Sequence, residues 1–350
     1  MKLETRTSST RQRVKRLLVG AAVGAVMVLY VAQQRRTRVV LPPPPPGWTV
    51  VYPPESVDAM LYTGDSIWAG AKDGVWRLSA ADARVLERQD CGRVIGYVHA
   101  LLSDPAGGLW VGHNNGLTHL GTGGCQTFTT ADGLPDSRVN ALLLDRQGQF
   151  WAGTQRGLAR RAASGWKIMN RADGLIDEMV NVLLEDGQGG LWVGSQVAPW
   201  GGLNILEGGS IRQFTRANGL PHPNIAALYR DRSGDVWVGT GFADKGGLAH
   251  FVRRNGAWVV DRVLHCSEGL PGERIRSIFE DRDGTLWLGS EMDGLARYRN
   301  GKVVQVLTVR DGMPHNEAAS MLETPDGSLW LGTPAGVVRI TREALSHAGI

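Results

Sequence analysis

The sequence predicts an all-β fold, a seven-bladed β-propeller with four-stranded blades, preceded by one N-terminal transmembrane helix. At seven places spaced 41 to 50 residues apart, a tryptophan is followed two residues later by a glycine. Short apolar segments separated by glycine-containing turns surround each copy. A β-type repeat of this length is typical of propeller blades. The pairs are Trp68 and Gly70, Trp110 and Gly112, Trp151 and Gly153, Trp192 and Gly194, Trp237 and Gly239, Trp287 and Gly289, and Trp330 and Gly332.

The unit that begins at residue 139 indicates how one blade is built. VNALLLD predicts an inner strand, and QFWAG, LARRA and GWKIMN predict the three strands that follow. Asp145 opens the first turn and Gly148 closes it, because a short acceptor side chain caps the turn and glycine tolerates unusual φ angles. We expect the tryptophan to fill the space between neighbouring blades. Aspartate recurs at the same turn position in Asp104, Asp186, Asp231 and Asp281.

A second recurring motif, DGLP at 132–135, falls where an outer strand must return to the next inner strand. Its glycine and proline are expected to set the bend. At the other end of the fold, residues 317–341 predict only three strands, whereas GWTVVY at 47–52 predicts a strand with no blade before it. We therefore expect residues 47–52 to complete the last blade, which removes the open edges of the ring. Variants of DGLP begin at Asp173, Asn218, Glu268 and Asp311.

The N-terminal residues predict a membrane anchor before the propeller of residues 47–350. Residues 1–16 form a basic tail, residues 17–34 the signal-anchor helix, and residues 35–46 a spacer whose five prolines favour stiff polyproline II. The uncharged run itself is short for a spanning helix, which needs ~20 residues, but flanking glutamines and arginines can extend it. A cleaved signal peptide is the alternative. Bulky Tyr30 makes a poor cleavage site, so an uncleaved anchor is favoured.

The charge distribution argues against nucleic-acid binding. The formal net charge is +4, but residues 1–46 carry nine Lys or Arg and one acid, which leaves 29 bases and 33 acids for the remainder. A net negative propeller does not supply the basic surface that phosphate binding requires.

Motifs for catalysis, metals or cofactors are not evident. His113, His222 and His315 fall in loops without a recurring carboxylate partner, and no GxSxG nucleophile motif occurs. Residues 281–291 resemble a calcium-binding loop, but they lack the full set of ligands of such a loop and coincide with the repeated turn. Three cysteines are too few for a disulfide framework or a zinc site, although one pair could form in an oxidising compartment. We expect a non-catalytic protein without cofactors, whose cysteines are small half-buried residues without chemistry.

The repeats resemble a known family. LLLDRQGQFWAGTQRGLARR, IFEDRDGTLWLGSEMDGLARY and FTTADGLPDSRVNALL are similar to the two-component regulator propeller repeats of periplasmic sensor regions in bacterial hybrid histidine kinases, over about residues 54–340. The resemblance implies extracytoplasmic sensing of a small molecule, an oligosaccharide or a peptide. The predicted anchor and the basic cluster before it, which would hold the N-terminus in the cytoplasm, predict a single-pass protein of the bacterial inner membrane with a periplasmic propeller. Those sensors usually add a β-sandwich and a kinase, so we expect a separate histidine kinase or another envelope protein as partner.

Two regions are candidate ligand sites. Among the turns between the second and third strands, those at 195–202 and 240–247 are the longest. We expect them to place Trp200 near Phe242, Asp244 and Lys245, as an aromatic and charged surface for a sugar or peptide. The alternative for Trp200 is a plug between blades. The second region is the position after the first apolar residue of each inner strand, expected to form a polar ring at the channel mouth. Its alternative role is to hold water. The seven positions are Asp58, His99, Asn140, Asn181, Ala226, Arg276 and Ala319.

Three functions fit these features. The first is an extracytoplasmic sensor that binds a ligand and acts in signal transduction. The second is a lyase or hydrolase of the streptogramin-lyase type, because fold alone does not exclude it. The third is a protein-interaction scaffold of the envelope, which a wide apolar face would favour.

Overall fold

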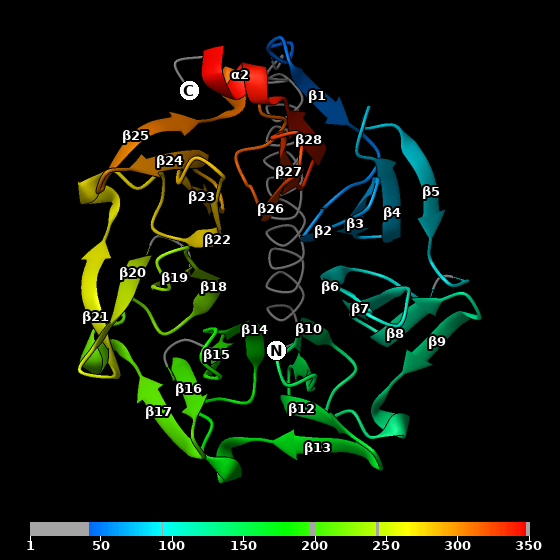
Figure 1. Ribbon diagram of the computed structural model, residues 1–350, viewed down its shortest axis with the longest axis vertical. Coiled ribbons are helices and arrows are strands. Elements are labelled where there is room, and N and C mark those ends of the chain that lie inside the picture. Colours follow the sequence, from blue (N-terminus) through cyan, green and yellow to red (C-terminus); the bar gives the residue numbers. More distant parts are fainter. Residues whose placement is uncertain (1–41, 93, 197–199, 243–244, 348–350) are drawn as a thin grey trace, which may run out of the picture. The chain divides into compact units, whose positions relative to one another are not determined.

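The computed structural model describes residues 42–92, 94–196, 200–242 and 245–347. Seven four-stranded antiparallel sheets follow one another around a ring, as predicted (Figure 1). The basic tail, the expected anchor at residues 17–34 and most of the spacer lie outside the described residues. Within the described ranges, no helix has both the length and the apolar character needed to cross a membrane.

Each blade runs from an inner strand at the channel to an outer strand at the rim (Figure 1). Blade one contains β2 (Ala59–Thr63), β3 (Ser66–Ala71), β4 (Gly74–Ser79) and β5 (Val85–Gln89). Blade two contains β6 (Val98–Ser103), β7 (Leu109–His113), β8 (Gly116–Gly121) and β9 (Gly124–Phe128). Blade three contains β10 (Val139–Leu144), β11 (Phe150–Thr154), β12 (Gly157–Ala162) and β13 (Gly165–Met169). Blade four contains β14 (Val180–Glu185), β15 (Leu191–Ser195), β16 (Leu203–Glu207) and β17 (Ser210–Phe214).

The remaining blades follow the same order, and α2 (Arg342–His347) comes after the last strand. Blade five contains β18 (Ile225–Arg230), β19 (Val236–Phe242), β20 (Lys245–Arg254) and β21 (Ala257–Leu264). Blade six contains β22 (Ile275–Glu280), β23 (Leu286–Ser290), β24 (Leu295–Arg299) and β25 (Lys302–Leu307). Blade seven contains β26 (Ser320–Glu323), β27 (Leu329–Thr333), β28 (Gly336–Ile340) and β1 (Trp48–Val51).

Strand β1 closes the ring, in the place expected for residues 47–52. It pairs antiparallel with β28, from Trp48 opposite Ile340 to Val51 opposite Val337 (Figure 1). The backbone N–H of Thr341 also donates to the carbonyl of Gly47 at 2.9 Å. Blade seven is therefore built from two ends of the propeller that are distant in sequence.

The repeated tryptophan packs each blade against the next one. Trp192, for example, is fully buried and lies in one cluster with Val236 and Val238 of the following blade. Trp330 of the last blade packs in the same way on Ile67 of the first. Each of the seven tryptophans belongs to a different apolar cluster. The interpretation of this residue as the filler between blades is confirmed.

The glycine two residues later allows the next inner strand to approach. A Cβ atom added at Gly289 would lie 2.3 Å from the carbonyl oxygen of Ala318, and one at Gly239 would lie 2.6 Å from that of Ile275. Any larger residue would push the following blade outward. These close contacts hold the inner strands around the channel.

The turn aspartate also fixes the tryptophan, which the sequence did not reveal. In blade six, Asp281 Oδ1 accepts from the backbone N–H groups of Asp283 and Thr285, at 2.9 Å each. Its Oδ2 accepts from Trp287 Nε1 at 2.8 Å. One carboxylate therefore satisfies both the turn and the buried indole. Trp151 and Trp237 make the same bond to Asp145 and Asp231.

The DGLP segments form short 3₁₀ helices that end in a left-handed glycine. Asn170 caps η2 (Arg171–Asp173) through its side chain, and Asp173 bonds back to the Asn170 backbone N–H. Gly174 follows with φ of 103°, a conformation that favours glycine. The same arrangement occurs in η1 (Thr130–Asp132), η3 (Arg216–Asn218) and η5 (Val309–Asp311). In η4 (Cys266–Glu268) the back-bond from Glu268 and the left-handed Gly269 are kept, without a side-chain cap from His265.

The expectation that the cysteines have no chemistry is wrong for two of them. Cys91 and Cys125 form a disulfide with a Cα–Cα distance of 6.0 Å, whereas Cys266 is free and exposed. Cys91 follows β5 of blade one and Cys125 lies on β9 of blade two. The bond therefore ties two neighbouring blades at the rim, where residues 34 positions apart become neighbours only after folding.

Trp287→Ala should lower the free energy of unfolding by about 3–5 kcal/mol, because it leaves a cavity between blades six and seven and removes the donor to Asp281. Trp200→Ala is the matched control. Trp200 is 71% exposed, so its removal should change stability by no more than about 0.5 kcal/mol. Urea unfolding followed by circular dichroism measures both. Equal effects of the two substitutions would contradict the assigned role of the tryptophan column.

The unfolded but unreduced protein should expose a single reactive thiol, that of Cys266, and reduction should expose three. A Cys91→Ser and Cys125→Ser double variant should be less stable than the oxidised protein by about 2–4 kcal/mol. Thiol titration in denaturant counts the groups directly. Three reactive thiols without reduction would rule out the bond in the purified protein.

Candidate functional site

The inner strands begin with a backbone irregularity that directs one side chain toward the channel. In blades two to six, the pairing of the inner strand with the second strand shifts by one residue immediately after the first apolar position. A β-bulge of this kind leaves one residue unpaired and turns its side chain. The five bulge residues are His99, Asn140, Asn181, Ala226 and Arg276.

These residues meet in one cavity at the centre of the ring. All seven positions of the predicted ring, with Asp58 from blade one and Ala319 from blade seven added, line a cavity of about 420 Å³. The prediction that they come together is thus matched by their placement. A second ring lies two residues further along the same strands and is entirely apolar, which sequence reasoning missed. It consists of Met60, Leu101, Leu142, Leu183, Leu228, Ile278 and Met321.

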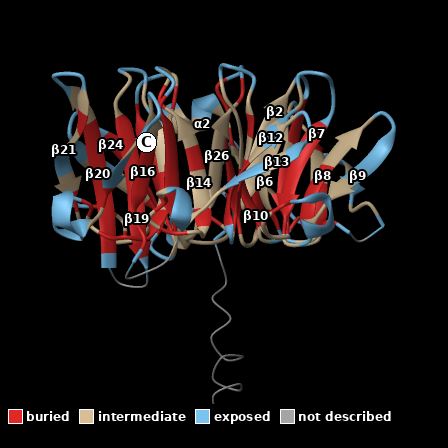
Figure 2. Cartoon of the chain, turned by 90° about the horizontal axis from the view of Figure 1, so that it is seen from below, coloured by how far each residue is buried: buried red, intermediate tan, exposed pale blue. Residues whose placement is uncertain are grey.

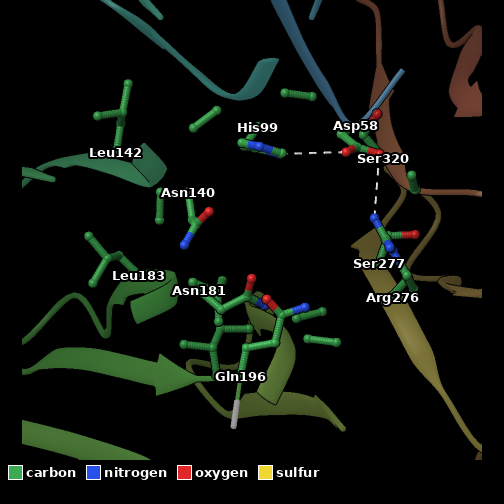
Figure 3. A pocket seen from close by; sticks show the side chains of 18 of the residues that line it. Asp58, His99, Asn140, Leu142, Asn181, Leu183, Gln196, Arg276, Ser277 and Ser320 are labelled. Carbon is green, nitrogen blue, oxygen red and sulfur yellow. Dashed lines mark hydrogen bonds and ion pairs between the residues drawn. The ribbon is translucent and has the colours of Figure 1, made fainter. Parts of the chain in front are cut away.

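One side of the cavity carries a network of charged groups (Figure 3). Arg276 lies between two carboxylates, with Nε 3.3 Å from Glu317 Oε1 and Nη2 3.4 Å from Asp58 Oδ1. Asp58 Oδ2 is in turn 3.7 Å from His99 Nδ1. Burial raises the pKa of Glu317, and the nearby charge of Arg276 opposes this rise. The network holds the Arg276 guanidinium at the cavity wall.

The opposite side carries amides (Figure 3). Asn140 Nδ2 donates to the carbonyl of Val180 and Asn181 Nδ2 to that of Ile225, each at 2.9 Å, so each amide bonds to the next inner strand. Gln196 lines the same side of the cavity. With charges on one wall, amides on the other and an apolar ring beyond, the cavity suits a ligand that has both hydrogen-bonding groups and an apolar face.

Two arginines of the cavity were also missed. Arg138 and Arg274 line it and stand two residues before Asn140 and Arg276. Arg138 Nε donates to Asn140 Oδ1 at 3.0 Å, and Arg274 pairs with Glu291. Side chains at i and i+2 of an extended segment share a face. A search for polar residues two positions before each ring residue would therefore have found both arginines.

The aromatic candidates lie apart from this cavity. Trp200 and Phe242 are 71% and 59% exposed, which excludes the plug between blades as the role of Trp200. Phe242 pairs with Lys245 at the tip of the β19–β20 hairpin, which projects beyond the body of the propeller (Figure 2). These three residues are absent from the cavity lining. Asp244 lies outside the described residues.

The loop histidines serve as turn caps. Nδ1 of His222 accepts from the backbone N–H of Asn224 at 3.1 Å, and Nδ1 of His315 from that of Glu317 at 2.9 Å. Asp136 and Asp177 cap the corresponding linkers of blades three and four through a carboxylate oxygen. Burial lowers the pKa of both histidines, which favours the neutral form that can accept this bond.

His113 has the same role in a fully buried position. Its Nδ1 accepts from the Asn115 backbone N–H at 3.2 Å, and its Nε2 lies 2.8 Å from Thr118 Oγ1. Burial, and to a smaller degree the charge of His99, lowers its pKa to about 4. A neutral ring with the proton on Nε2 satisfies both contacts.

Comparison with known proteins identifies the repeats. Residues 133–156, 174–196, 219–242, 269–292 and 312–335 match the family described as "Two component regulator propeller". The chain carries two component regulator propeller repeats. Each match begins at the linker glycine and ends at or just after the end of the second strand of one blade, from blade three to blade seven. The resemblance stated from the sequence is confirmed. No curated protein matches the sequence.

Solved structures share the propeller fold. The extracellular domain of a hybrid two component system from B. thetaiotaomicron superposes with a TM-score of 0.73 at 20% identity, over 87% of this chain and 42% of that one. PorZ, a bacterial surface component of the type-IX secretion system of Porphyromonas gingivalis, gives 0.63 at 15% identity, over 84% of this chain and 47% of that one. The repeat protein thus spans less than half the length of these two chains.

An enzyme has the same fold. Virginiamycin B lyase from Staphylococcus aureus, solved as a catalytically inactive variant with quinupristin, superposes with a TM-score of 0.63 at 14% identity. The match covers 84% of this chain and 98% of the lyase. At these identities the comparisons establish the fold, and function has to be argued from the site.

Acidification should destabilise the protein through His113. Its pKa is 6.5 when unfolded and about 4 when folded, so only the unfolded chain takes up this proton between those values. His113 therefore leaves the free energy of unfolding unchanged above pH 6.5. As the pH drops from 6.5 toward 4, protonation of the unfolded chain lowers this free energy by on the order of 3 kcal/mol. Other groups titrate in the same range, so the measurement is the difference in pH dependence between wild type and His113→Asn. Parallel curves for the two proteins would contradict the assignment.

Proposed function

We propose that this propeller is a non-catalytic, ligand-binding sensor module that acts outside the cytoplasm. The observation that carries the proposal is the central cavity, in which one position from each of seven inner strands forms a largely polar ring above an apolar one. Scaffold-held concave sites with a few convergent polar groups are the usual binding sites for small molecules. A small molecule, an oligosaccharide or a peptide is the proposed ligand.

Two further observations support a location outside the cytoplasm. Cys91 and Cys125 are disulfide-bonded, and such bonds persist mainly in oxidising compartments. The B. thetaiotaomicron propeller with the same fold is an extracellular domain. Residues 17–34 are the proposed anchor in the bacterial inner membrane, with the N-terminus in the cytoplasm. A membrane histidine kinase or another envelope protein is the proposed recipient of the signal.

A lyase activity is the second candidate. His99 and Asp58 lie 3.7 Å apart on the cavity wall, and a histidine beside a carboxylate can move a proton during catalysis. Incubation of the protein with quinupristin, followed by mass spectrometry, tests this candidate directly. Conversion of quinupristin in wild type but not in His99→Ala would favour the enzyme over the sensor.

Ala226→Trp should abolish ligand binding without breaking a contact, because this alanine is one of the two small positions in the polar ring and a tryptophan there would fill the cavity. The measurement is the thermal shift of the protein with neutral oligosaccharides, uronic-acid oligosaccharides and short peptides, since a bound ligand stabilises the folded state. Exposed Ala131 in η1 provides the matched control, Ala131→Trp.

The outcomes separate the candidate sites. A shift that is lost in Ala226→Trp and kept in Ala131→Trp supports the sensor cavity. A shift that survives Ala226→Trp and disappears in Trp200→Ala would move the site to the exposed turns of blades four and five. Absence of a shift with every sugar and peptide would overturn the small-ligand sensor in favour of a scaffold.

A further inference from the structure

Blade five contains a cluster of potential metal ligands at the turn between β18 and β19, separate from the central cavity. Ligand atoms of Asp231, Asp235 and His250 all lie within 4.8 Å of one another. His250 is only 6% exposed, yet neither of its ring nitrogens has a hydrogen-bond partner. Its Nε2 lies 3.4 Å from Asp235 Oδ2. A buried imidazole without such partners is costly unless another group binds it.

The other blades show that this cluster is a departure from the repeat. In each blade, the tryptophan of the second strand lies opposite one residue of the third strand, and in four blades this residue is an arginine. In blade seven the arginine, Arg339, pairs with Asp326 of the turn at 2.8 Å. Blade five has His250 at this place, stacked on Trp237 with ring centroids 4.1 Å apart. It also has Asp235 in the turn, where the other described blades have an uncharged residue. These residues are Ser66, Gly108, Gln149, Gly190, Thr285 and Ser328.

A third carboxylate faces the other ring nitrogen. Asp261 Oδ2, on the outer strand β21, lies 3.6 Å from His250 Nδ1, while Asp261 Oδ1 is held by Arg254. Histidines that bind metals usually donate the N–H of the second ring nitrogen to a carboxylate, which orients the ring toward the ion. His250 thus has Nε2 toward Asp235 and Nδ1 toward Asp261, and Asp231 offers a further carboxylate oxygen within 4.8 Å of the cluster's other ligand atoms.

The geometry points to a divalent transition-metal site formed by His250 Nε2, Asp235 and Asp231, with Asp261 orienting the histidine. Asp231 keeps its role in the turn, because its Oδ1 accepts from the Asp235 N–H and from Ser233 Oγ. Its Oδ2 accepts only from Trp237 Nε1 and has a second lone pair for an ion. One imidazole with two carboxylates suits Zn²⁺ or Co²⁺. Ca²⁺, which takes six to eight oxygen ligands, does not fit this set. The ion would join the turn to the third strand.

The test is calorimetric titration of the chelator-treated full-length protein with Zn²⁺, and absorption spectroscopy with Co²⁺. Wild type should bind a single equivalent at this site and give Co²⁺ bands that indicate a nitrogen and oxygen ligand set. Asp235→Asn preserves the shape of the turn and should lower Zn²⁺ affinity more than tenfold. Asp261→Asn should lower it by about tenfold, as expected for a residue that orients a ligand.

Blade two provides the matched control. His119 contacts Trp110 in a tilted arrangement with ring centroids 4.5 Å apart, and its Nε2 lies 2.8 Å from Asp104 Oδ2. Gly108 stands where blade five has Asp235. His119→Asn should leave Zn²⁺ affinity unchanged, whereas His250→Asn should remove the site. Failure of wild type to bind Zn²⁺ or Co²⁺, or equal affinity in wild type and Asp235→Asn, would overturn the proposal. In that case Asp235 and Asp261 would serve only as polar neighbours of the His250 ring.

Discussion

The packing of one tryptophan per blade against the following blade is the constraint on which the rest of this structure depends. The apolar surface of the indole covers the second strand of the next blade. In blades three, five and six the turn carboxylate also accepts a hydrogen bond from the indole, as Asp281 does from Trp287. The glycine two residues away then admits the next inner strand at close range. Because this contact is repeated seven times around a closed ring, the inner strands have little freedom to shift relative to one another.

The central cavity follows from this arrangement. The first apolar residue of each inner strand is buried against the preceding blade, and the next residue faces the channel. In blades two to six a β-bulge releases this residue from the ladder. Asn140 and Asn181 reinforce the geometry, because each bonds to the inner strand of the neighbouring blade. A ligand in the cavity would therefore touch groups that are themselves part of blade-to-blade contacts, so binding and the packing of the ring are physically linked.

Features that repeat with a period were predictable from the sequence, and features that depend on a single pair of distant residues were not. The spacing of tryptophan and glycine predicts seven blades, and the polar residue after the first apolar position predicts the ring from Asp58 to Arg276. The pairing of Cys91 with Cys125 depends on which outer strands become neighbours, and spacing carries no such information. Arg138 and Arg274 were missed because they precede the apolar position that marks the strand. Trp200 was recognised as unusual, but its exposure depends on the path of one long turn.

The closing strand β1 determines where a pulling force on the N-terminal side of the propeller would first act. Strand β1 is the first strand of the described residues, and β28 is its one strand partner there, over four residue pairs. The side chain of Trp48 also packs in the apolar cluster with Trp287 and Ile340. A pulling force on the chain before Trp48 would therefore act first on this short antiparallel ladder, and blade seven would open before any other. The ring is thus a closed structure with one defined seam, at the pairing of β1 with β28.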